Sequence, residues 1–298
     1  MRVVHIDAGR EMRGGQWQVL RLLEGLVQAG RDPLLLARGG SPLLEMAAGR
    51  GLAAKPLGIA ALVRESSAAA LVHAHDGRSH ALAAVLARAP LVVSRRVAFP
   101  IRGSVASRWK YARARHYLAV SEHVREVLLK AGIPAEKITV VYDGVPSGKF
   151  APGGRRIVAP ATEDPAKGSE LLREAARLAG VEIHFSGNLE ADLPQAAMLV
   201  YITRQEGLGS AALLAMAAGV PVLASRVGGL MEVVEDGESG ILTENDPVAI
   251  AGAMSRMAGD VELLRRLGAR ARQRVREKFS EAAMVRGTLD VYRKVLSC

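Results

Sequence analysis

The chain has 298 residues, of which 49% are hydrophobic and 4% aromatic, and it carries a formal net charge of +10 at pH 7. At about 100 to 200 residues per domain, this length predicts two domains with well-filled cores. The single cysteine, Cys298, excludes an intramolecular disulfide and favours a reducing compartment. We find neither a secretory signal nor an apolar run of the ~20 residues that a membrane span needs, so we expect a soluble, cytoplasmic protein.

The positive charge is concentrated in the first half of the chain. Residues 1–148 contain 21 Lys and Arg against 11 Asp and Glu, whereas residues 149–298 contain 19 of each. Residues 95–115 hold seven basic residues and no acidic one, together with aromatic side chains that either anchor at an interface or belong to the core. This surface suits a phosphorylated acceptor or the anionic inner leaflet of a membrane, where each basic side chain adds ~1 kcal/mol. Nucleic acid is a second candidate by charge alone, and an ordinary solvated face is a third.

Strand and helix patterns alternate through the first half, which is the order of a doubly wound α/β domain. The strand patterns cover residues 2–6, 33–37, 57–59, 69–74, 91–94, 117–120 and 138–142. The helix patterns cover residues 16–28, 43–48, 80–89 and 122–130, and a basic helix precedes residue 117. The loop after the first strand carries the adjacent pair Gly14 and Gly15, so it is not the dinucleotide-binding fingerprint G-x-G-x-x-G.

Polar side chains follow the strand over residues 69–74. His75, Asp76 and Arg78 come at the carboxyl end of this strand, where doubly wound sheets bind ligands, so they are candidates for holding an acceptor. His73 and His75 share one face of the strand, which raises a metal site as an alternative. No further ligand spacing accompanies them, so we expect no metal and interpret them as hydrogen-bonded structural histidines.

Two arginines, Arg95 and Arg96, follow the strand over residues 91–94. A guanidinium binds phosphate or carboxylate through paired N–H groups better than it binds a neutral hydroxyl. We therefore expect an anionic acceptor or a diphosphate near them.

The second half opens with residues 146–154, a Pro- and Gly-rich stretch that predicts a linker. Strand patterns follow at residues 157–159, 181–185, 198–202 and 220–224. Helix patterns cover residues 169–179 and 191–197, an alanine-rich segment from about residue 210, and residues 247–259, 261–278 and 281–296. These elements predict a second α/β domain.

Residues 204–232, RQEGLGSAALLAMAAGVPVLASRVGGLME, read as loop, helix, turn and strand. Glu206 precedes a glycine loop, Gly207 to Ser210, that leads directly into the alanine-rich helix. Glycines permit close backbone approach to a ligand, and the free N–H groups and dipole at a helix start suit a phosphate. The simpler alternative is an ordinary loop-to-helix transition. The stretch therefore predicts a site for a phosphorylated ligand.

The same stretch resembles the donor-site segment of family 4 glycosyltransferases, which are retaining, nucleotide-sugar-dependent enzymes of the GT-B fold. The family pattern is Glu-Gly-Phe/Leu-Gly, then Ala-Met-Ala-x-Gly-x-Pro-Val, then Gly-Gly-x-x-Glu. The chain matches it at Glu206, Gly207, Leu208, Gly209, Ala215, Met216, Ala217, Gly219, Pro221, Val222, Gly228, Gly229 and Glu232. Residues 119–145 resemble the stretch that closes the family's first domain, with Asp143 in place of the usual Asn.

This resemblance spans nearly the whole chain and implies an α/β fold of the GT-B type, with two doubly wound, Rossmann-like parallel-sheet domains facing a cleft. Residues 1–147 would form the acceptor-side domain, residues 148–280 the nucleotide-sugar domain, and residues 281–298 a helix that packs back on the first domain. Only 39 positions separate Lys167 from Glu206, about half the family's usual spacing, so we expect a shortened second domain. The implied activity is hexosyl or heptosyl transfer from a nucleoside diphosphate sugar to a saccharide or lipid-linked acceptor, in lipopolysaccharide or surface-polysaccharide synthesis.

The resemblance also implies roles for individual residues. The catalytic set is Glu206, contacting a sugar hydroxyl, Lys167, contacting the diphosphate, and His75, near the acceptor. The implied donor-binding residues are Gly14, Gly15, Gly187, Asn188, Gly207, Leu208, Gly209 and Ser210. The implied acceptor-binding residues are Asp76, Arg78, Arg95 and Arg96. No metal or other cofactor is implied, nucleic acid becomes an unlikely partner, and the basic first domain suggests a peripheral contact with an anionic membrane.

The chain departs from the family pattern at two positions. Leu214 stands where the family has the acid that holds the nucleotide ribose, and about Pro160 the first of two diphosphate-binding cations is missing. A lost charge-assisted hydrogen bond weakens binding by ~1.5 to 3 kcal/mol. These departures keep open the alternative of a catalytically weak or inactive GT-B-like binding or scaffold protein. A sugar-nucleotide epimerase on the same fold is a further alternative, although we find no acid/base constellation for it.

Overall fold

The computed structural model describes residues 1–101, 103–146 and 153–297. The described chain forms two compact units, unit 1 from Met1 to Gly144 together with the segment from Glu281, and unit 2 from Val145 to Ser280. Most of the predicted linker over residues 146–154 lies outside the described residues, as do Arg102 and Cys298. Within the described ranges, no helix is both long and apolar enough to cross a membrane.

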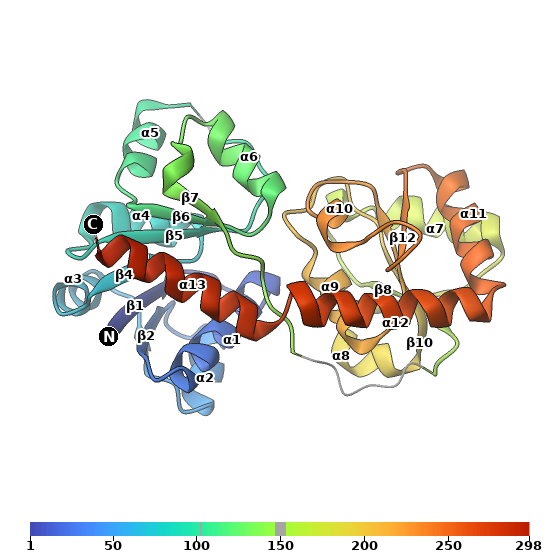
Figure 1. Cartoon of the computed structure of the whole chain (residues 1–298), viewed down its shortest axis with the longest axis horizontal. Coiled ribbons are helices and arrows are strands. Elements are labelled where there is room, and N and C mark those ends of the chain that lie inside the picture. The colour runs from blue at the N-terminus through green and yellow to red at the C-terminus, as the bar shows by residue number, and fades with distance from the viewer. Residues whose placement is uncertain (102, 147–152, 298) are drawn as a thin grey trace. The chain divides into compact units, whose positions relative to one another are not determined.

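Unit 1 is built on a seven-stranded sheet with the order β3-β2-β1-β4-β5-β6-β7 (Figure 1). All neighbouring strands are parallel. The strands are β1 (Arg2–Asp7), β2 (Asp32–Ala37), β3 (Ala54–Pro56), β4 (Leu71–Ala74), β5 (Leu91–Arg95), β6 (His116–Ala119) and β7 (Ile138–Val140). Because helices cover both faces of the sheet, its central strands are almost fully buried and mostly apolar, with His5, Asp7 and His73 as buried polar exceptions.

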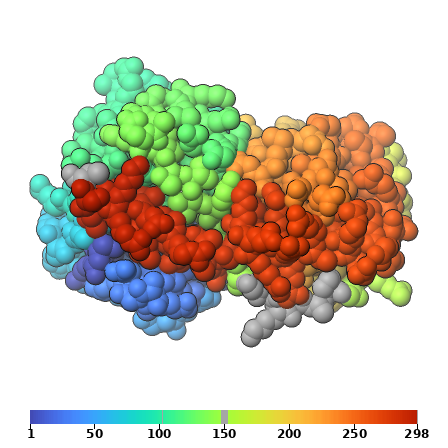
Figure 2. Space-filling model, in the orientation of Figure 1, coloured from blue at the N-terminus to red at the C-terminus, as the bar shows by residue number. Residues whose placement is uncertain are grey.

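The α-helices of unit 1 include two sets whose members pack against one another. They are α1 (Gly14–Gln28), α2 (Pro42–Gly49), α3 (Ile59–Ser67), α4 (Gly77–Leu86), α5 (Val105–Ala112), α6 (Glu122–Lys130) and α13 (Glu281–Leu296). Helix α1 packs against α2 and α13, while α4 packs against α3 and α5. The chain's last helix, α13, places Leu289 and Tyr292 in a core shared with α1 and the central strands. Figure 2 shows α13 on the surface of unit 1 beside the N-terminal segments.

Unit 2 contains a five-stranded parallel sheet with the order β12-β11-β10-β8-β9. Its strands are β8 (Arg156–Pro160), β9 (Ile183–Ser186), β10 (Ala196–Tyr201), β11 (Val222–Ser225) and β12 (Ile241–Thr243). Its α-helices are α7 (Ser169–Ala179), α8 (Leu189–Asp192), α9 (Ser210–Ala218), α10 (Leu230–Val233), α11 (Pro247–Ala258) and α12 (Val261–Lys278). Helix α7 packs against α11, and α9 packs against α12.

In each sheet the chain first adds strands toward one edge and then, from one pair of neighbouring strands, adds the rest toward the opposite edge. In unit 1, β1 leads outward to β2 and its neighbour β4 leads the other way to β5. In unit 2, β8 leads to β9 and its neighbour β10 leads the other way to β11. Right-handed crossovers then put the following helices on opposite faces and open a crevice at the carboxyl ends of the two strands. The loops after β1, β4, β8 and β10 are therefore where ligands are expected.

Two predicted elements are wrong. The strand predicted over residues 57–59 is instead the end of a loop, because Gly58 caps α3 and the buried positions Leu62, Glu65 and Ser66 follow helical spacing. The helix predicted over residues 191–197 is only α8 followed by a 3-10 turn, η3 (Leu193–Gln195). Pro194 in that turn has no backbone N–H to donate, so the hydrogen-bond pattern of α8 does not continue through it.

The second sheet is smaller than the first because little chain joins two of its strands. Between β9 and β10 the chain forms only α8 and η3, without a further strand. Two short elements of unit 2, α10 and β12, were not predicted.

Candidate active site

The crevice of unit 2 holds an acid, a cation and a phenol in contact. Lys167, at the end of the 3-10 helix η2 (Pro165–Lys167) after β8, lies 2.7 Å from Glu206 Oε2 in the loop after β10. Tyr201, the last residue of β10, donates its hydroxyl proton to the same carboxylate oxygen. Lys167 Nζ also lies 3.2 Å from the Tyr201 hydroxyl. The side chains of Lys167 and Glu206 remain 30% and 15% exposed, so this pair is accessible to a ligand.

Tyr201 orients the carboxylate as a neutral phenol. Burial, and then the negative charge of Glu206, raise the pKa of Tyr201 well above its ordinary value. Its O–H therefore stays protonated and remains a donor to Glu206 at neutral pH. The other carboxylate oxygen, Oε1, accepts the N–H of Gly207 at 3.0 Å. These contacts fix the rotamer of Glu206 before any ligand binds.

Two glycines at and beside this loop are required, Gly229 by close backbone contacts and Gly209 by its backbone conformation. A Cβ on Gly229 would lie 2.1 Å from the carbonyl oxygen of Gly207, and the Gly229 N–H donates to Glu206 O at 3.1 Å. Gly209 has φ of 111°, a left-handed conformation that favours glycine, at the N-cap of α9. The loop thus packs against the start of α10 and turns directly into α9.

Helix α9 begins beside Glu206 with free donors. Its first intrahelical bond runs from Leu213 N to Gly209 O, so the preceding N–H groups, from Ser210 on, are free of helical partners and carry the positive end of the helix dipole. Leu208 is buried, so only its backbone can face a ligand. Leu214, one turn into the helix, is partly exposed.

The remaining predicted donor residues of unit 2 lie on the same edge of the sheet. Gly187 and Asn188 follow β9 and are exposed, and the Asn188 side chain accepts the Ala191 N–H at 3.3 Å as the cap of α8. Pro160 ends β8, and the loop from it to Lys167 contains no arginine. Arg204, in the next loop, is exposed and is the nearest arginine along the chain on this edge.

The crevice of unit 1 holds three buried histidines. His5 on β1 pairs in register with His73 on β4, and His5 Nδ1 lies 2.9 Å from His75 Nε2. His73 contacts the Tyr292 hydroxyl through Nδ1 at 2.6 Å and the Ser94 hydroxyl through Nε2 at 2.8 Å. Burial, assisted by the Arg96 charge, lowers the pKa of His5 to about 3 and lowers the pKa values of His73 and His75 well below the ordinary range. All three are therefore neutral at pH 7.

His5 and His75 are hydrogen-bonded to each other and His73 to Tyr292 and Ser94, so most ring nitrogens of the three histidines already have a partner. Ligand nitrogens of the three rings lie within 4.8 Å of one another, a spacing that could suit a metal ion. However, Arg96 Nη1 donates to His75 Nδ1 at 3.3 Å, so the proton of His75 is on Nε2, facing His5. A guanidinium at this distance opposes a metal charge, and both nitrogens of His73 are already bonded. The arrangement is a structural network, and His75 is buried within it.

Arg96 is held by a carboxylate as well as by His75. Its Nε lies 3.0 Å from Asp143 Oδ1, and both side chains are nearly buried. Asp143, which stands where the family usually has an Asn, is therefore the carboxylate that holds Arg96. The charge predicted to face an anionic acceptor is therefore already balanced.

Arg95 and Asp76 also have partners within unit 1. Arg95 donates to the Tyr111 hydroxyl at 2.8 Å and to the Phe99 carbonyl. Asp76 is the N-cap of α4, and its carboxylate also accepts the Ala8 N–H at 2.7 Å, which ties the loop after β1 to α4. Both side chains stabilise loops in the structure described.

Gly14 and Gly15 form the first turn of α1, in the loop region after β1. A Cβ on Gly15 would lie 3.9 Å from the Arg96 side chain, so this turn borders the buried network. Nearby, Gln16 and the Gly9 N–H bond to Asp7. Burial, and then the neighbouring Asp76 charge, raise the pKa of Asp7.

Arg78 lies at an apolar hollow along the same edge of the sheet. A cavity of about 300 Å³ is lined by Ala8, Arg38, Leu57, Gly58, Ile59, Leu62, Arg78, Leu82 and Leu86. Ala8, Arg38, Leu57 and Arg78 follow the ends of β1, β2, β3 and β4, so four neighbouring strands contribute to it. Neither Arg38 nor Arg78 forms an ion pair with a described residue.

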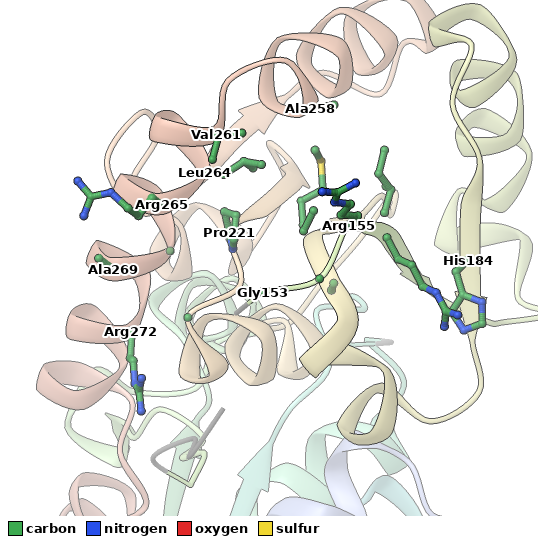
Figure 3. A pocket seen from close by; sticks show the side chains of 18 of the residues that line it. Gly153, Arg155, His184, Pro221, Ala258, Val261, Leu264, Arg265, Ala269 and Arg272 are labelled. Atoms are coloured by element: carbon green, nitrogen blue, oxygen red, sulfur yellow. The ribbon is translucent and has the colours of Figure 1, made fainter. Parts of the chain in front are cut away.

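Another hollow, this one in unit 2, lies away from Glu206. It has a volume of about 1560 Å³ and includes Arg155, Pro221 and Arg272 in its lining (Figure 3). Arg155 immediately precedes β8, and Pro221 immediately precedes β11. The hollow is therefore at the amino ends of the strands, the edge at which parallel sheets do not usually place catalytic groups.

Comparison with known proteins agrees with this architecture. Residues 12–148 match the profile described as Glycosyltransferase Family 4, and residues 157–260 match that of Glycosyl transferases group 1. Two parallel-sheet α/β domains of this kind make up the GT-B fold, so the predicted fold is confirmed. The chain therefore has the GT-B fold, and each of its two domains resembles a glycosyltransferase family model.

Individual proteins that resemble the chain are glycosyltransferases and related synthases. Anabaena HepE, solved with UDP and glucose, is 16% identical with a TM-score of 0.86, over 99% of this chain and 100% of that one. Sucrose-phosphate synthase from Thermosynechococcus elongatus is 20% identical with a TM-score of 0.80, over 100% and 99%. N-acetyl-alpha-D-glucosaminyl L-malate synthase of Bacillus anthracis is 34% identical over 110 residues, 37% of this chain and 29% of the relative. MMP alpha-(1->4)-mannosyltransferase of Mycolicibacterium hassiacum is 30% identical over 218 residues, 59% of this chain and 53% of the relative. These matches thus span between about a third and half of the length of the curated relatives.

Four residues of these sites were missed in the sequence. Tyr201 ends a predicted strand and could have been found by the same reasoning that singled out His75. His5 lies within a strand and carries no local motif, while Asp143 was noted only as a replacement of the family's Asn, without a sign of its pairing with Arg96. Arg38 follows a strand end, but the hollow beside it depends on α3, which the sequence did not reveal.

Proposed function

We propose that the protein is a retaining glycosyltransferase that moves a hexosyl or heptosyl group from a nucleoside diphosphate to a saccharide or lipid-linked acceptor, in lipopolysaccharide or another surface glycan. The observation that carries the proposal is the contact of Lys167 with Glu206 and Tyr201 at the crevice of unit 2, beside the start of α9. A diphosphate needs cations and N–H donors, and a sugar needs a fixed carboxylate. This crevice offers all three within one small region.

In this proposal the residues of unit 2 position the donor and stabilise the leaving group. The Lys167 ammonium and the N–H groups at Ser210 and beyond bind the diphosphate, whose charge grows as the bond to the sugar breaks. Glu206, held by Tyr201, accepts a hydrogen bond from a sugar hydroxyl. Gly187 and Asn188 lie near the base. The leaving diphosphate helps to deprotonate the acceptor on the same face of the sugar, so that the configuration is retained.

For the acceptor we propose the hollow between α3 and α4. Its lining combines aliphatic side chains with the guanidinium groups of Arg38 and Arg78, a combination that suits a phosphate joined to an apolar chain. A lipid-linked acceptor has this chemistry. We expect Arg38→Gln with Arg78→Gln to raise the KM for such an acceptor about tenfold while donor affinity is unchanged.

The first experiment is calorimetric titration of the folded protein with UDP, GDP and ADP, with and without an attached sugar. UDP comes first because HepE was solved with UDP and UDP-glucose. We expect binding of one nucleotide, tighter with its sugar than without. If the folded protein binds none of them, the enzyme proposal fails.

The second experiment separates transfer from simple binding. Glu206→Ala removes the sugar contact but leaves Lys167 and α9 in place, so the nucleotide alone should bind nearly as before, while transfer and donor hydrolysis should fall about a hundredfold. Glu182→Ala, at an exposed position just before β9, is the matched control in the same unit. Wild-type activity of Glu206→Ala would refute the assignment.

A non-catalytic GT-B-like binding protein is the second candidate. It is favoured by Leu214 in place of the ribose-binding acid and by the missing arginine near Pro160. The two candidates differ in turnover: a binding protein would hold a nucleotide sugar without hydrolysing or transferring it to any offered acceptor.

A further inference from the structure

The loop after β10 carries an arginine that is left without a carboxylate partner in the described chain. Arg204 is exposed and forms no ion pair with any residue that the structure describes. It lies between two members of the candidate site, Tyr201 and Glu206. An exposed arginine by itself is ordinary on a protein surface. Its surroundings in the fold therefore decide whether it has a function.

Few cations are found at the edge of unit 2 where ligands are expected. The segments between each strand and the α-helix that follows it are residues 161–168, 187–188, 202–209, 226–229 and 244–246, all of them described. Their Lys and Arg residues are Lys167, Arg204 and Arg226. Arg226 pairs with Asp236, and Lys167 pairs with Glu206. Arg204 is therefore the one cation of these segments whose charge is not balanced by a described acid.

Backbone hydrogen bonds hold Arg204 beside Lys167. The Arg204 N–H donates to the carbonyl oxygen of Ala166 at 2.8 Å. The hydroxyl of Thr203 donates to the same carbonyl oxygen at 3.3 Å. Because Ala166 directly precedes Lys167, these contacts join the loop after β8 to the loop after β10. The side chains of Lys167 and Arg204 thus start from adjacent points of the crevice.

A ring of three hydrogen bonds fixes the residue before Arg204. The Thr203 N–H donates to Ser225 Oγ at 2.9 Å, Ser225 Oγ donates to Asn245 Oδ1 at 2.6 Å, and Asn245 Nδ2 donates to Thr203 O at 3.0 Å. Ser225 is the last residue of β11, and Asn245 follows β12. Thr203 and Ser225 are buried, where hydrogen bonds are stronger than in water. The loops after β8, β11 and β12 thus hold the backbone that carries Arg204.

A diphosphate needs more positive charge than Lys167 supplies. The ammonium is already opposed by the Glu206 carboxylate at 2.7 Å, so the pair has little net charge before a ligand binds. The start of α9 adds only about half an elementary charge. A guanidinium stays charged at physiological pH and donates two parallel N–H groups to phosphate oxygens. Arg204 therefore supplies the chemistry that a diphosphate still needs.

We propose that Arg204 is a second cation of the diphosphate site, and that Ser225 and Asn245 are positioning residues that hold its loop. This inference rests on the proposed transfer from a nucleoside diphosphate sugar. In that reaction the bond from the sugar carbon to the diphosphate oxygen breaks, and its electron pair stays on the diphosphate. The sugar carbon bonds to the acceptor oxygen, whose proton passes to the diphosphate. Arg204 and Lys167 together stabilise the negative charge that grows on the leaving group.

The test compares two substitutions of Arg204 by titration calorimetry with UDP, GDP and ADP. Arg204→Gln should weaken binding of the diphosphate that the wild-type chain binds by about tenfold to a hundredfold, because a charge-assisted contact is lost. Arg204→Lys keeps the charge but not the paired N–H groups, so it should lose less. Arg177→Gln, at an exposed position in the last turn of α7, is the matched control and should bind as the wild type does.

Asn245→Ala tests the positioning role. It opens the ring of hydrogen bonds while Arg204 stays in the chain, so diphosphate affinity should fall about fivefold. The same substitution in the Arg204→Gln background should have much less effect, because the cation that the ring positions is already gone. A purely structural role would give equal losses in both backgrounds. Urea denaturation of each variant checks that it is folded.

Failure of this inference can be told apart from failure of the proposed function. If the folded wild-type chain binds none of the three diphosphates, the proposed function fails and this inference with it. If the wild type binds one of them and Arg204→Gln binds it equally tightly, only this inference is overturned. A loss that appears with the nucleotide sugar but not with the nucleotide alone would place Arg204 at the sugar, which also overturns it. Equal losses for Asn245→Ala in the two backgrounds would refute the positioning role.

Discussion

The two crevices are built from similar side chains that are used in different ways. In unit 2, Lys167 and Glu206 meet at a partly exposed edge, where a charged ligand can displace or join the pair. In unit 1, Arg96 and Asp143 meet with side chains only 13% and 7% exposed and are joined to buried histidines. Exposed charge at a strand end is available for a ligand, whereas buried and paired charge holds the scaffold. The position of a charged residue after a strand is therefore not sufficient to identify a ligand contact.

The largest effect is expected in unit 1. Arg96→Met leaves Asp143 buried without its cation, which should lower the free energy of unfolding by about 3 to 5 kcal/mol. Urea denaturation measures this, and Arg96→Met with Asp143→Leu should recover much of the loss. An unchanged midpoint in the single variant would mean that the pair is not the scaffold contact we describe.

The next effect is expected in unit 2 and on function. Lys167→Met should weaken binding of the nucleoside diphosphate or lower transfer about a hundredfold, while stability changes little because the lysine is partly exposed. Lys130→Met, on exposed α6, is the control. Equal loss of nucleotide binding or transfer in both variants, or loss of folding in Lys167→Met, would contradict this comparison. Charge in unit 2 would then not be reserved for a ligand while charge in unit 1 holds the scaffold.

A variant of unit 2 that binds nucleotide more tightly would further support the comparison of the two crevices. Leu214→Glu restores a carboxylate on α9 at the position of the family's ribose-binding acid, so nucleotide affinity should rise by about 1.5 to 3 kcal/mol, roughly tenfold or more. Leu214→Gln, with a weaker acceptor, should give a smaller gain. Titration calorimetry measures the nucleotide affinity of each variant. Weaker nucleotide binding by both variants would contradict the placement of the ribose beside α9.

The last effect concerns pH and is measured in unit 1. Burial lowers the pKa of His80 and of His116 to about 4, so the unfolded chain binds protons below pH ~6.5 that the folded chain does not. Stability should therefore fall as the pH drops from 7 toward 4, by up to about 3 kcal/mol for each such histidine. Both tryptophans are in unit 1, so urea unfolding followed by their fluorescence reports it. His80→Asn should reduce the dependence of the free energy of unfolding on pH. A urea midpoint that does not change with pH would contradict the lowered pKa values of these histidines.

Much of the fold followed from local patterns. The helices α6, α7 and α12 begin and end where they were predicted, because Ser121, Gly168 and Asp260 precede them and their apolar residues have helical spacing. Helix α3 was missed because its buried side includes Glu65, which pairs with Arg2 and Lys55 from other segments. A buried acid does not show as an apolar position in the sequence.

The sequence by itself determined the class of fold and the glycine-bearing loop after β10 that carries Glu206, because these depend on glycines, caps and strand ends that are local. Only the tertiary structure decided which charges are free. Asp143 is 47 residues from Arg96, and Tyr292 is 219 residues from His73. Whether a guanidinium faces a ligand or a carboxylate, and whether a tryptophan is buried or exposed, depends on such distant neighbours, since burial and Coulomb energy are properties of the folded environment.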